Sequence, residues 1–369
     1  MSLDHYYLLG RSGLRVSRIA LGTMNFGTGG FHAAYGKTEQ EARPIFRRYL
    51  EAGGNLIDTA DFYTAGESET ILGNLIAEAG VRDRVVLTTK FTNSVAPGDP
   101  NAGGNGRKHM IRAVEASLRR LRTDYIDLFL LHTWDRITPV EEVMRTFDDL
   151  TRAGKIRYAG LSDVPSWYAA RAQTLAEAHS LVPVVSLQLP YSLIDRTIEL
   201  EHVTMGQNLG LGITAWSPLG GGFLTGKYRQ TGRGLAGEGR LSDAGSPGGS
   251  WTDRDWRLLT TLNGVAGKLD MTMAQVALNW VATQPGIASA IIGASSADQL
   301  DANMAALDAE LPAELRAELD EASSVPPRSV YRMFTPEYQS WLVSPGVKVG
   351  DKPAGYAPAV QNWAPESSG

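Results

Sequence analysis

Cysteine is absent from this chain of 369 residues, which excludes disulfide bonds, thiolate metal sites and cysteine nucleophiles. Positive charge is in short supply. There are 35 lysines and arginines against 40 aspartates and glutamates, a net charge of −5, so the basic face of a nucleic-acid-binding protein is not expected. The six histidines are scattered singly, so a clustered metal site is not expected either.

Long apolar runs are also missing. No stretch approaches the about 18 apolar residues of a membrane helix, and the start of the chain is polar by Asp4, unlike a signal peptide. We therefore expect a cytoplasmic protein without a membrane partner. Nothing in the sequence specifies an oligomeric state. The chain does hold 43% hydrophobic residues, which is ample material for a core.

These apolar residues fall into short runs that alternate with helical segments. Residues 6–9 and 14–16 predict a hairpin around a glycine-bearing turn. The alternation that follows predicts a (β/α)8 TIM barrel over residues 1–324. The expected strands cover residues 18–22, 55–57, 85–90, 126–132, 156–161, 184–188, 212–216 and 288–292. The expected helices cover residues 38–52, 67–79, 107–121, 138–152, 166–178 and 198–209.

Two segments break this rhythm. Residues 219–250 are glycine-rich and too long for an ordinary loop, which predicts a functional flap. Residues 325–369 form an extended C-terminal tail, whose prolines disfavour a continuous helix while its aromatic rings need cover. We expect Tyr331 and Phe334 either at the mouth of a substrate pocket or packed on the outer helices, with equal weight for the two.

Titratable side chains follow three successive strands. Asp58, Lys90 and His132 stand at strand ends, and Tyr63 lies in the loop after the first of them. In a parallel barrel these ends share one rim, where catalytic groups collect. A lysine ammonium would lower the pKa of a neighbouring tyrosine, and an aspartate would hold that lysine. Such a site would protonate a carbonyl oxygen and would need a hydride donor.

Two other chemistries need to be considered. The segment from Gly221 to Lys227 is one residue short of a P-loop, and Tyr228, which stands where the magnesium-binding serine or threonine belongs, argues against nucleoside-triphosphate hydrolysis. Lys90 at a strand end is also the position from which a barrel aldolase would form a Schiff base.

The order and spacing of several short motifs favour the chemistry of proton and hydride transfer, and the aldolase stays open as an alternative. The chain resembles the aldo-keto reductase superfamily over almost its whole length, in a branch that includes microbial reductases and potassium-channel β subunits. The motifs that carry the resemblance are Asp58-Thr59-Ala60 with Tyr63, Thr88-Thr89-Lys90, Leu131-His132, Gly160-Leu161-Ser162, Gln188, Trp216-Ser217-Pro218-Leu219, Gly226-Lys227-Tyr228 and Ile292-Gly293-Ala294-Ser295.

This resemblance implies a reversible, NADPH-dependent reduction of a small aldehyde or ketone, with Asp58, Tyr63, Lys90 and His132 as catalytic residues. It favours NADPH over NADH through Lys227 and Arg240. Asp163 stands where asparagine is commoner. The implied NADP(H) contacts are Gly22, Thr23, Met24, Asp58, Ser162, Asp163, Gln188, Trp216, Ser217, Pro218, Leu219, Gly221, Gly226, Lys227, Arg240, Gly293, Ser295, Gln299 and Asn303. Around the substrate we expect Phe26, Tyr63, Phe91, His132 and Trp134. The alternative that the same branch offers is a cofactor-binding regulatory subunit with little turnover.

Overall fold

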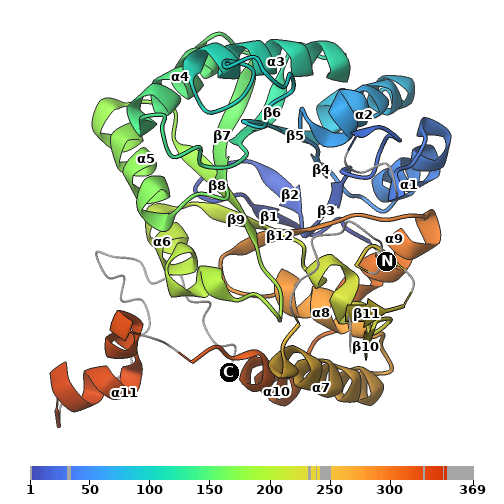
Figure 1. Cartoon of the computed structure of the whole chain (residues 1–369), viewed down its shortest axis with the longest axis vertical. Helices are drawn as coiled ribbons and strands as arrows, with labels where there is room; N and C mark the ends of the chain where they lie inside the picture. Colours follow the sequence, from blue (N-terminus) through green and yellow to red (C-terminus); the bar gives the residue numbers. More distant parts are fainter. Residues whose placement is uncertain are drawn as a thin grey trace.

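The computed structural model describes residues 2–30, 35–231, 234–237, 239–241, 251–326, 329–343 and 345–346. Within these ranges parallel strands close an eight-stranded barrel in the order β12-β3-β4-β5-β6-β7-β8-β9 (Figure 1). The predicted TIM barrel is thereby confirmed. Its strands are β3 (Ile19–Gly22), β4 (Leu56–Asp58), β5 (Val86–Phe91), β6 (Ile126–Leu131), β7 (Ile156–Ser162), β8 (Val184–Pro190), β9 (Gly212–Trp216) and β12 (Ile287–Ile292).

Helices surround this barrel and follow the predicted ranges closely. The capping box expected at the first helix is present, because Thr38 and Glu41 each accept a hydrogen bond from the other's backbone. The helices are α1 (Glu39–Glu51), α2 (Glu67–Ala79), α3 (Arg107–Leu121), α4 (Val140–Arg152), α5 (Ser166–His179), α6 (His202–Leu209), α7 (Asp253–Leu269), α8 (Met273–Ala282), α9 (Ala297–Met304) and α10 (Ala313–Ser323).

One predicted helix is wrong as drawn. Residues 198–209 split into the 3₁₀ turn η4 (Thr197–Leu200) and α6. The break is at Glu201, whose backbone angles (φ −142°, ψ −49°) are not helical. Its carboxylate accepts hydrogen bonds from Ser166 and from Tyr331, so tertiary contacts hold this residue outside the helix.

The barrel separates two apolar clusters. Inside it, Leu56, Val86 and Leu128 pack with Leu9 and Val16, which lie beside or within the hairpin strands β1 (Tyr6–Leu8) and β2 (Arg15–Ser17). The predicted hairpin therefore closes the amino-terminal end of the barrel. The larger cluster lies between the barrel and its helices. Consecutive strand residues point to opposite sides of the wall, and this alternation decides which side chains reach the site.

The two irregular segments differ in how they meet the barrel. The described part of the flap forms the 3₁₀ turn η5 (Gly220–Thr225) and the hairpin β10 (Arg229–Thr231) and β11 (Gly234–Ala236). Residues 232–233, 238 and 242–250 of this predicted flap lie outside the described residues. The described tail forms η7 (Ser329–Phe334), α11 (Pro336–Tyr338) and η8 (Gln339–Val343), which stand beside the barrel in Figure 1.

Two aromatic rings of this tail, Phe334 and Trp341, are not buried as expected. Phe334 is 63% exposed and Trp341 is 70% exposed, and the two pair edge-on with their neighbours Tyr331 and Tyr338. Tyr331 does reach the barrel, where its hydroxyl donates to Glu201 at 2.6 Å. The expectation of burial is wrong for these two rings: the described tail forms only short turns, and Phe334 and Trp341 pair with tyrosines of the tail itself. Residues 347–369 of the tail lie outside the described residues.

Over the described ranges, no helix combines the length and apolar character that crossing a membrane requires. The same part of the chain contains no group of three histidine, aspartate or glutamate side chains arranged to hold a metal ion.

Candidate active site

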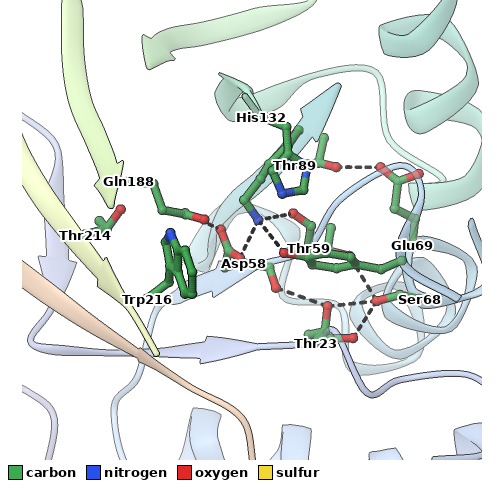
Figure 2. A network of polar contacts seen from close by, with 12 residues as sticks. Thr23, Asp58, Thr59, Ser68, Glu69, Thr89, His132, Gln188, Thr214 and Trp216 are labelled. Carbon is green, nitrogen blue, oxygen red and sulfur yellow. Dashed lines mark hydrogen bonds and ion pairs between the residues drawn. The ribbon is translucent and has the colours of Figure 1, made fainter. Parts of the chain in front are cut away.

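Three of the four predicted catalytic side chains meet at the carboxyl ends of the strands (Figure 2). The Lys90 ammonium donates to Asp58 Oδ1 at 2.6 Å, to the Thr59 carbonyl at 2.7 Å and to the Tyr63 hydroxyl at 3.3 Å. β4 ends at Asp58, and Lys90 is the second-last residue of β5, beside it in the barrel. We call Asp58, Tyr63 and Lys90 the rim cluster.

Lys90 is protonated although its side chain has no exposed surface. An ammonium has three N–H donors, and here each of them has an acceptor. Burial lowers the pKa of Lys90, but the neighbouring Asp58 and Tyr63 raise it by more, so the net shift is upward. A Schiff-base lysine needs a neutral amine. The aldolase interpretation therefore fails at this residue.

Tyr63 keeps its proton in this environment. The ring is 9% exposed. Burial raises the pKa of the phenol above its ordinary value, and the charge on Lys90 opposes that rise without reversing it. This corrects the expectation of a lowered pKa: desolvation exceeds the attraction of the ammonium. The rim cluster therefore contains a neutral phenol with a proton to give.

His132 lies beside this phenol, with its ring 5.8 Å from that of Tyr63. Burial, aided by the charge on Lys90, holds the pKa of the imidazole well below its ordinary value, so the ring is neutral. Its Nδ1 lies 3.3 Å from the amide nitrogen of Asn93. Because an amide nitrogen only donates, Nδ1 accepts and the ring proton sits on Nε2.

Further polar groups stand at the ends of β7, β8 and β9, where a cofactor was predicted. Gln188 donates to Asp58 Oδ2 at 2.8 Å, which ties this side to the rim cluster. Ser162 is 1% exposed, and its hydroxyl is buried without a hydrogen-bond partner among the described residues. Trp216 donates through Nε1 to Asp163 Oδ1 at 3.0 Å. An orphaned buried hydroxyl is costly unless a ligand pairs with it.

The end of β3 contributes backbone more than side chains. A Cβ on Gly22 would lie 2.9 Å from the Ile291 side chain, so only glycine fits there. The Thr23 hydroxyl is fully buried and shares a hydrogen bond with Ser68 at 2.9 Å. Its side chain is therefore occupied, and Met24, the next residue, is half-buried.

The flap side carries the predicted phosphate residues. Ser217, Gly220, Gly221 and Gly222 all have positive φ, which bends the backbone sharply after β9 through Pro218 and Leu219. Gly226 follows with φ 75°. η5 leads into β10 and not into the α-helix that follows a P-loop, which is a second argument against that motif.

The backbone beside one predicted cation runs over the other. A Cβ on Gly239 would lie 2.4 Å from Lys227 Nζ, and the guanidinium of the next residue, Arg240, lies 5.1 Å from the centre of the Tyr35 ring. At the other end of the site, Gly293 follows β12, and Gln299 on α9 accepts from both the backbone and the hydroxyl of Ser295. Asn303 lies one turn further along α9 and is 7% exposed.

Two predicted substrate contacts are wrong. Phe91 has no exposed surface and stacks on Phe129 at 5.1 Å, between the barrel and α4. It follows Lys90 in β5, so with Lys90 pointing inward Phe91 must point outward. Phe26 is also fully buried, in the larger apolar cluster between the barrel and its helices. Trp134 stays at the rim, half-buried and edge-on to Trp167.

Sequence reasoning missed Asn93 and a second buried group of charges. The signal for Asn93 was its place three residues after Lys90, just beyond β5. On the other face of β5, Glu69 accepts from Thr89 at 2.6 Å and from Arg120 at 2.6 Å, next to the buried Asp61. We call Asp61, Glu69, Thr89 and Arg120 the outer cluster.

Comparison with known proteins agrees with this geometry. A family model described as Aldo/keto reductase family matches residues 18–324. The chain belongs to the aldo/keto reductase family. An oxidoreductase of Bacillus subtilis, YrpG, is 36% identical over 91% of this aldo/keto reductase and 99% of its own length. Norsolorinic acid reductase stcV of Emericella nidulans is 35% identical, over 86% of this chain and 81% of its own length. A probable voltage-gated potassium channel subunit beta of Oryza sativa is 34% identical, over 82% of this chain and 91% of its own length.

Proposed function

We propose that this aldo/keto reductase reduces an aldehyde or ketone to the alcohol, reversibly, with NADPH as hydride donor. The observation that carries the proposal is the rim cluster, where one buried ammonium contacts both the Asp58 carboxylate and the Tyr63 hydroxyl. A neutral phenol beside a fixed positive charge can release a proton, because the charge stabilises the phenolate that remains.

Within this mechanism each residue of the rim cluster has one task. Tyr63 donates its proton to the carbonyl oxygen as negative charge develops there. Lys90 stabilises the phenolate at 3.3 Å, and Asp58 holds the ammonium in place from the other side. In the oxidation direction the same phenolate accepts the proton of the alcohol.

His132 polarises the carbonyl as a neutral hydrogen-bond donor. The contact with Asn93 fixes the ring proton on Nε2, the nitrogen that is then available to the substrate oxygen. A neutral imidazole does not compete with Tyr63 as the acid, since it gives up its N–H proton far less readily than a phenol does. Asn93 is thus a positioning residue in this mechanism.

The residues at the strand ends fit a nicotinamide cofactor. The orphaned hydroxyl of Ser162 lies in the same layer as Gln188, so the two can pair with the ring's carboxamide. Trp216 offers its indole face to the ring, the positive-φ turn from Ser217 to Gly222 gives the backbone close access to phosphate, and Ser295, Gln299 and Asn303 hold the adenosine end. When bound, this cofactor supplies the hydride.

Preference for NADPH is proposed from Lys227 and Arg240. Each can pair with the additional phosphate that distinguishes NADPH from NADH. Measured dissociation constants are expected to favour NADPH by at least about tenfold. The variant Arg240→Gln is expected to weaken the binding of NADPH and to leave the affinity for NADH unchanged. Equal affinities of the unaltered protein for the two cofactors contradict the assignment.

The reaction itself is tested by following NADPH oxidation across sugar, steroid, terpenoid and aryl carbonyls. The fungal relative named as a norsolorinic acid reductase supports including aromatic ketones in this panel. Turnover of at least one class, abolished in Tyr63→Phe, is the expected result. The rice relative named as a channel subunit supports the second candidate, a cofactor-binding regulatory subunit. Tight NADPH binding with no turnover of any carbonyl would favour that candidate.

A further inference from the structure

Asp163 places a carboxylate in the proposed nicotinamide pocket, and its position is tightly fixed. Its backbone N–H donates to the Gln188 carbonyl at 3.2 Å, and its own carbonyl accepts from the Trp134 N–H at 3.3 Å. The residue has φ 46°, a left-handed conformation that aspartate tolerates better than most residues. Its Oδ1 accepts the indole N–H of Trp216 at 3.0 Å. The carboxylate therefore lies at the edge of the indole against which the ring is proposed to stack.

The titratable neighbours of Asp163 leave its charge poorly balanced. Among the residues that the structure describes, Lys90 is the cation that acts on Asp163, and that ammonium is already shared between Asp58 and Tyr63. Tyr63 and His132 are neutral for the reasons given above, and the groups that pack on Asp163 from β8 and β9, Gln188 and Trp216, are uncharged. Burial, partly offset by the Trp216 hydrogen bond, raises the pKa of Asp163 to about 6. Near neutral pH it is a half-buried anion.

Building on the proposed function, we infer that the Asp163 carboxylate makes this site bind the oxidised nicotinamide cofactor more tightly, relative to the reduced one, than a neutral residue would. The oxidised ring carries a positive charge and the reduced ring carries none. A fixed anion at the ring's edge, partly shielded from water, attracts only the first of these. The overall equilibrium of the reaction is unchanged, but the complex that starts alcohol oxidation is stabilised over the complex that starts carbonyl reduction.

The test is the ratio of two dissociation constants, Kd(NADPH)/Kd(NADP⁺), measured by fluorescence titration without substrate. Both cofactor forms share the same carboxamide and the same phosphates, so altered hydrogen bonds and phosphate titration cancel in the ratio. In the unaltered protein the ratio is expected to rise several-fold between about pH 5 and about pH 8, as Asp163 ionises. In Asp163→Asn it is expected to be lower at about pH 8, by about fivefold to tenfold, and independent of pH.

Asp124→Asn is the matched control. It removes one carboxylate at an exposed position just before β6, at the opposite end of the barrel from the rim. Its ratio is expected to follow that of the unaltered protein. If Asp163→Asn does not fold, the pH dependence of the ratio in the unaltered protein still tests the inference. A ratio that is flat with pH, or the same in Asp163→Asn and the unaltered protein, overturns the inference while NADPH binding stands. If neither cofactor form binds the unaltered protein, the proposed function fails and this inference with it.

Discussion

Two consecutive residues of β5, Thr89 and Lys90, serve two buried charge clusters on opposite faces of one barrel wall. Lys90 points into the barrel and holds the rim cluster, whereas Thr89 points outward and donates to Glu69 in the outer cluster. Both clusters pair a cation with a carboxylate, at 2.6 Å in each case. Burial and ion pairing by themselves therefore do not identify a catalytic site.

The clusters differ in what surrounds the cation. In the rim cluster the Lys90 ammonium donates to three acceptors, one of which is the hydroxyl of Tyr63, a neutral phenol. In the outer cluster α2 and α3 cover the charges: Glu69 has no exposed surface and Arg120 reaches it from α3. Asp61 is buried there with neither carboxylate oxygen paired among the described residues. We propose that the first arrangement performs the chemistry, whereas the second fastens α2 and α3 to the barrel.

The largest expected effect separates the clusters by activity. Tyr63→Phe removes the proton donor and is expected to lower kcat by at least about a thousandfold, the upper range of general acid catalysis. NADPH affinity should stay within about threefold, because the phenol is not needed to hold the cofactor. Steady-state kinetics and a fluorescence titration measure the two quantities.

Tyr49→Phe is the control for that substitution. The Tyr49 hydroxyl is fully buried and donates to backbone carbonyls far from the rim. Its loss is expected to reduce stability by about 1 kcal/mol and to leave kcat unchanged. Substantial reductase activity in Tyr63→Phe would mean that another group is the acid.

The next effect is on stability. Glu69→Gln leaves the partly exposed Arg120 without its ion pair and is expected to lower the free energy of unfolding by about 2 kcal/mol, with kcat within about twofold. Urea unfolding gives the first number. Glu78→Gln, which breaks exposed ion pairs with Arg43 and Arg47, should change the free energy of unfolding much less than Glu69→Gln does. A large loss of kcat with little loss of stability in Glu69→Gln would place the outer cluster in the mechanism.

A smaller effect depends on pH. Burial first, and then the nearby Glu69, raise the pKa of Asp61 well above its ordinary value. A carboxyl with a raised folded-state pKa contributes stability at low pH and loses it as pH rises through that value. Asp61→Asn is therefore expected to be more stable than the unaltered protein near pH 7, by at least about 1 kcal/mol, and to lose this advantage below about pH 4. An advantage that is independent of pH contradicts the explanation.

The smallest expected effect involves neither cluster. Ending the chain after Ser324 removes the tail, whose aromatic rings Phe334 and Trp341 are mostly exposed. Stability and NADPH affinity are expected to stay within about 0.5 kcal/mol of the full chain. If the tail borders the substrate pocket, KM or carbonyl selectivity changes instead. Unchanged kinetics across the substrate panel would show that it has no part in recognition.

Much of the architecture follows from local pattern. The alternation of apolar runs with capped helices predicts the barrel, and the first helix begins where Thr38 and Glu41 place it. The failures are equally physical. Residues 198–209 break at Glu201 because Ser166 and Tyr331, far away in the chain, bond its carboxylate. Phe91 was placed at the rim because a strand end alone does not say which way a side chain points.

The sequence by itself determined which titratable residues end the barrel strands, because strand length and turn position are local properties. Only the tertiary structure decided their states, because a pKa depends on burial and on charges brought in from other strands. The tertiary structure provides an acceptor for each N–H of the Lys90 ammonium. It raises the pKa of Tyr63 where a lowered pKa was expected, and it brings the Asn93 amide within 3.3 Å of His132 Nδ1. Thr89 and Lys90 point to opposite faces of the barrel wall. Thr89 therefore contacts the outer cluster, and Lys90 belongs to the rim cluster that we propose to be catalytic.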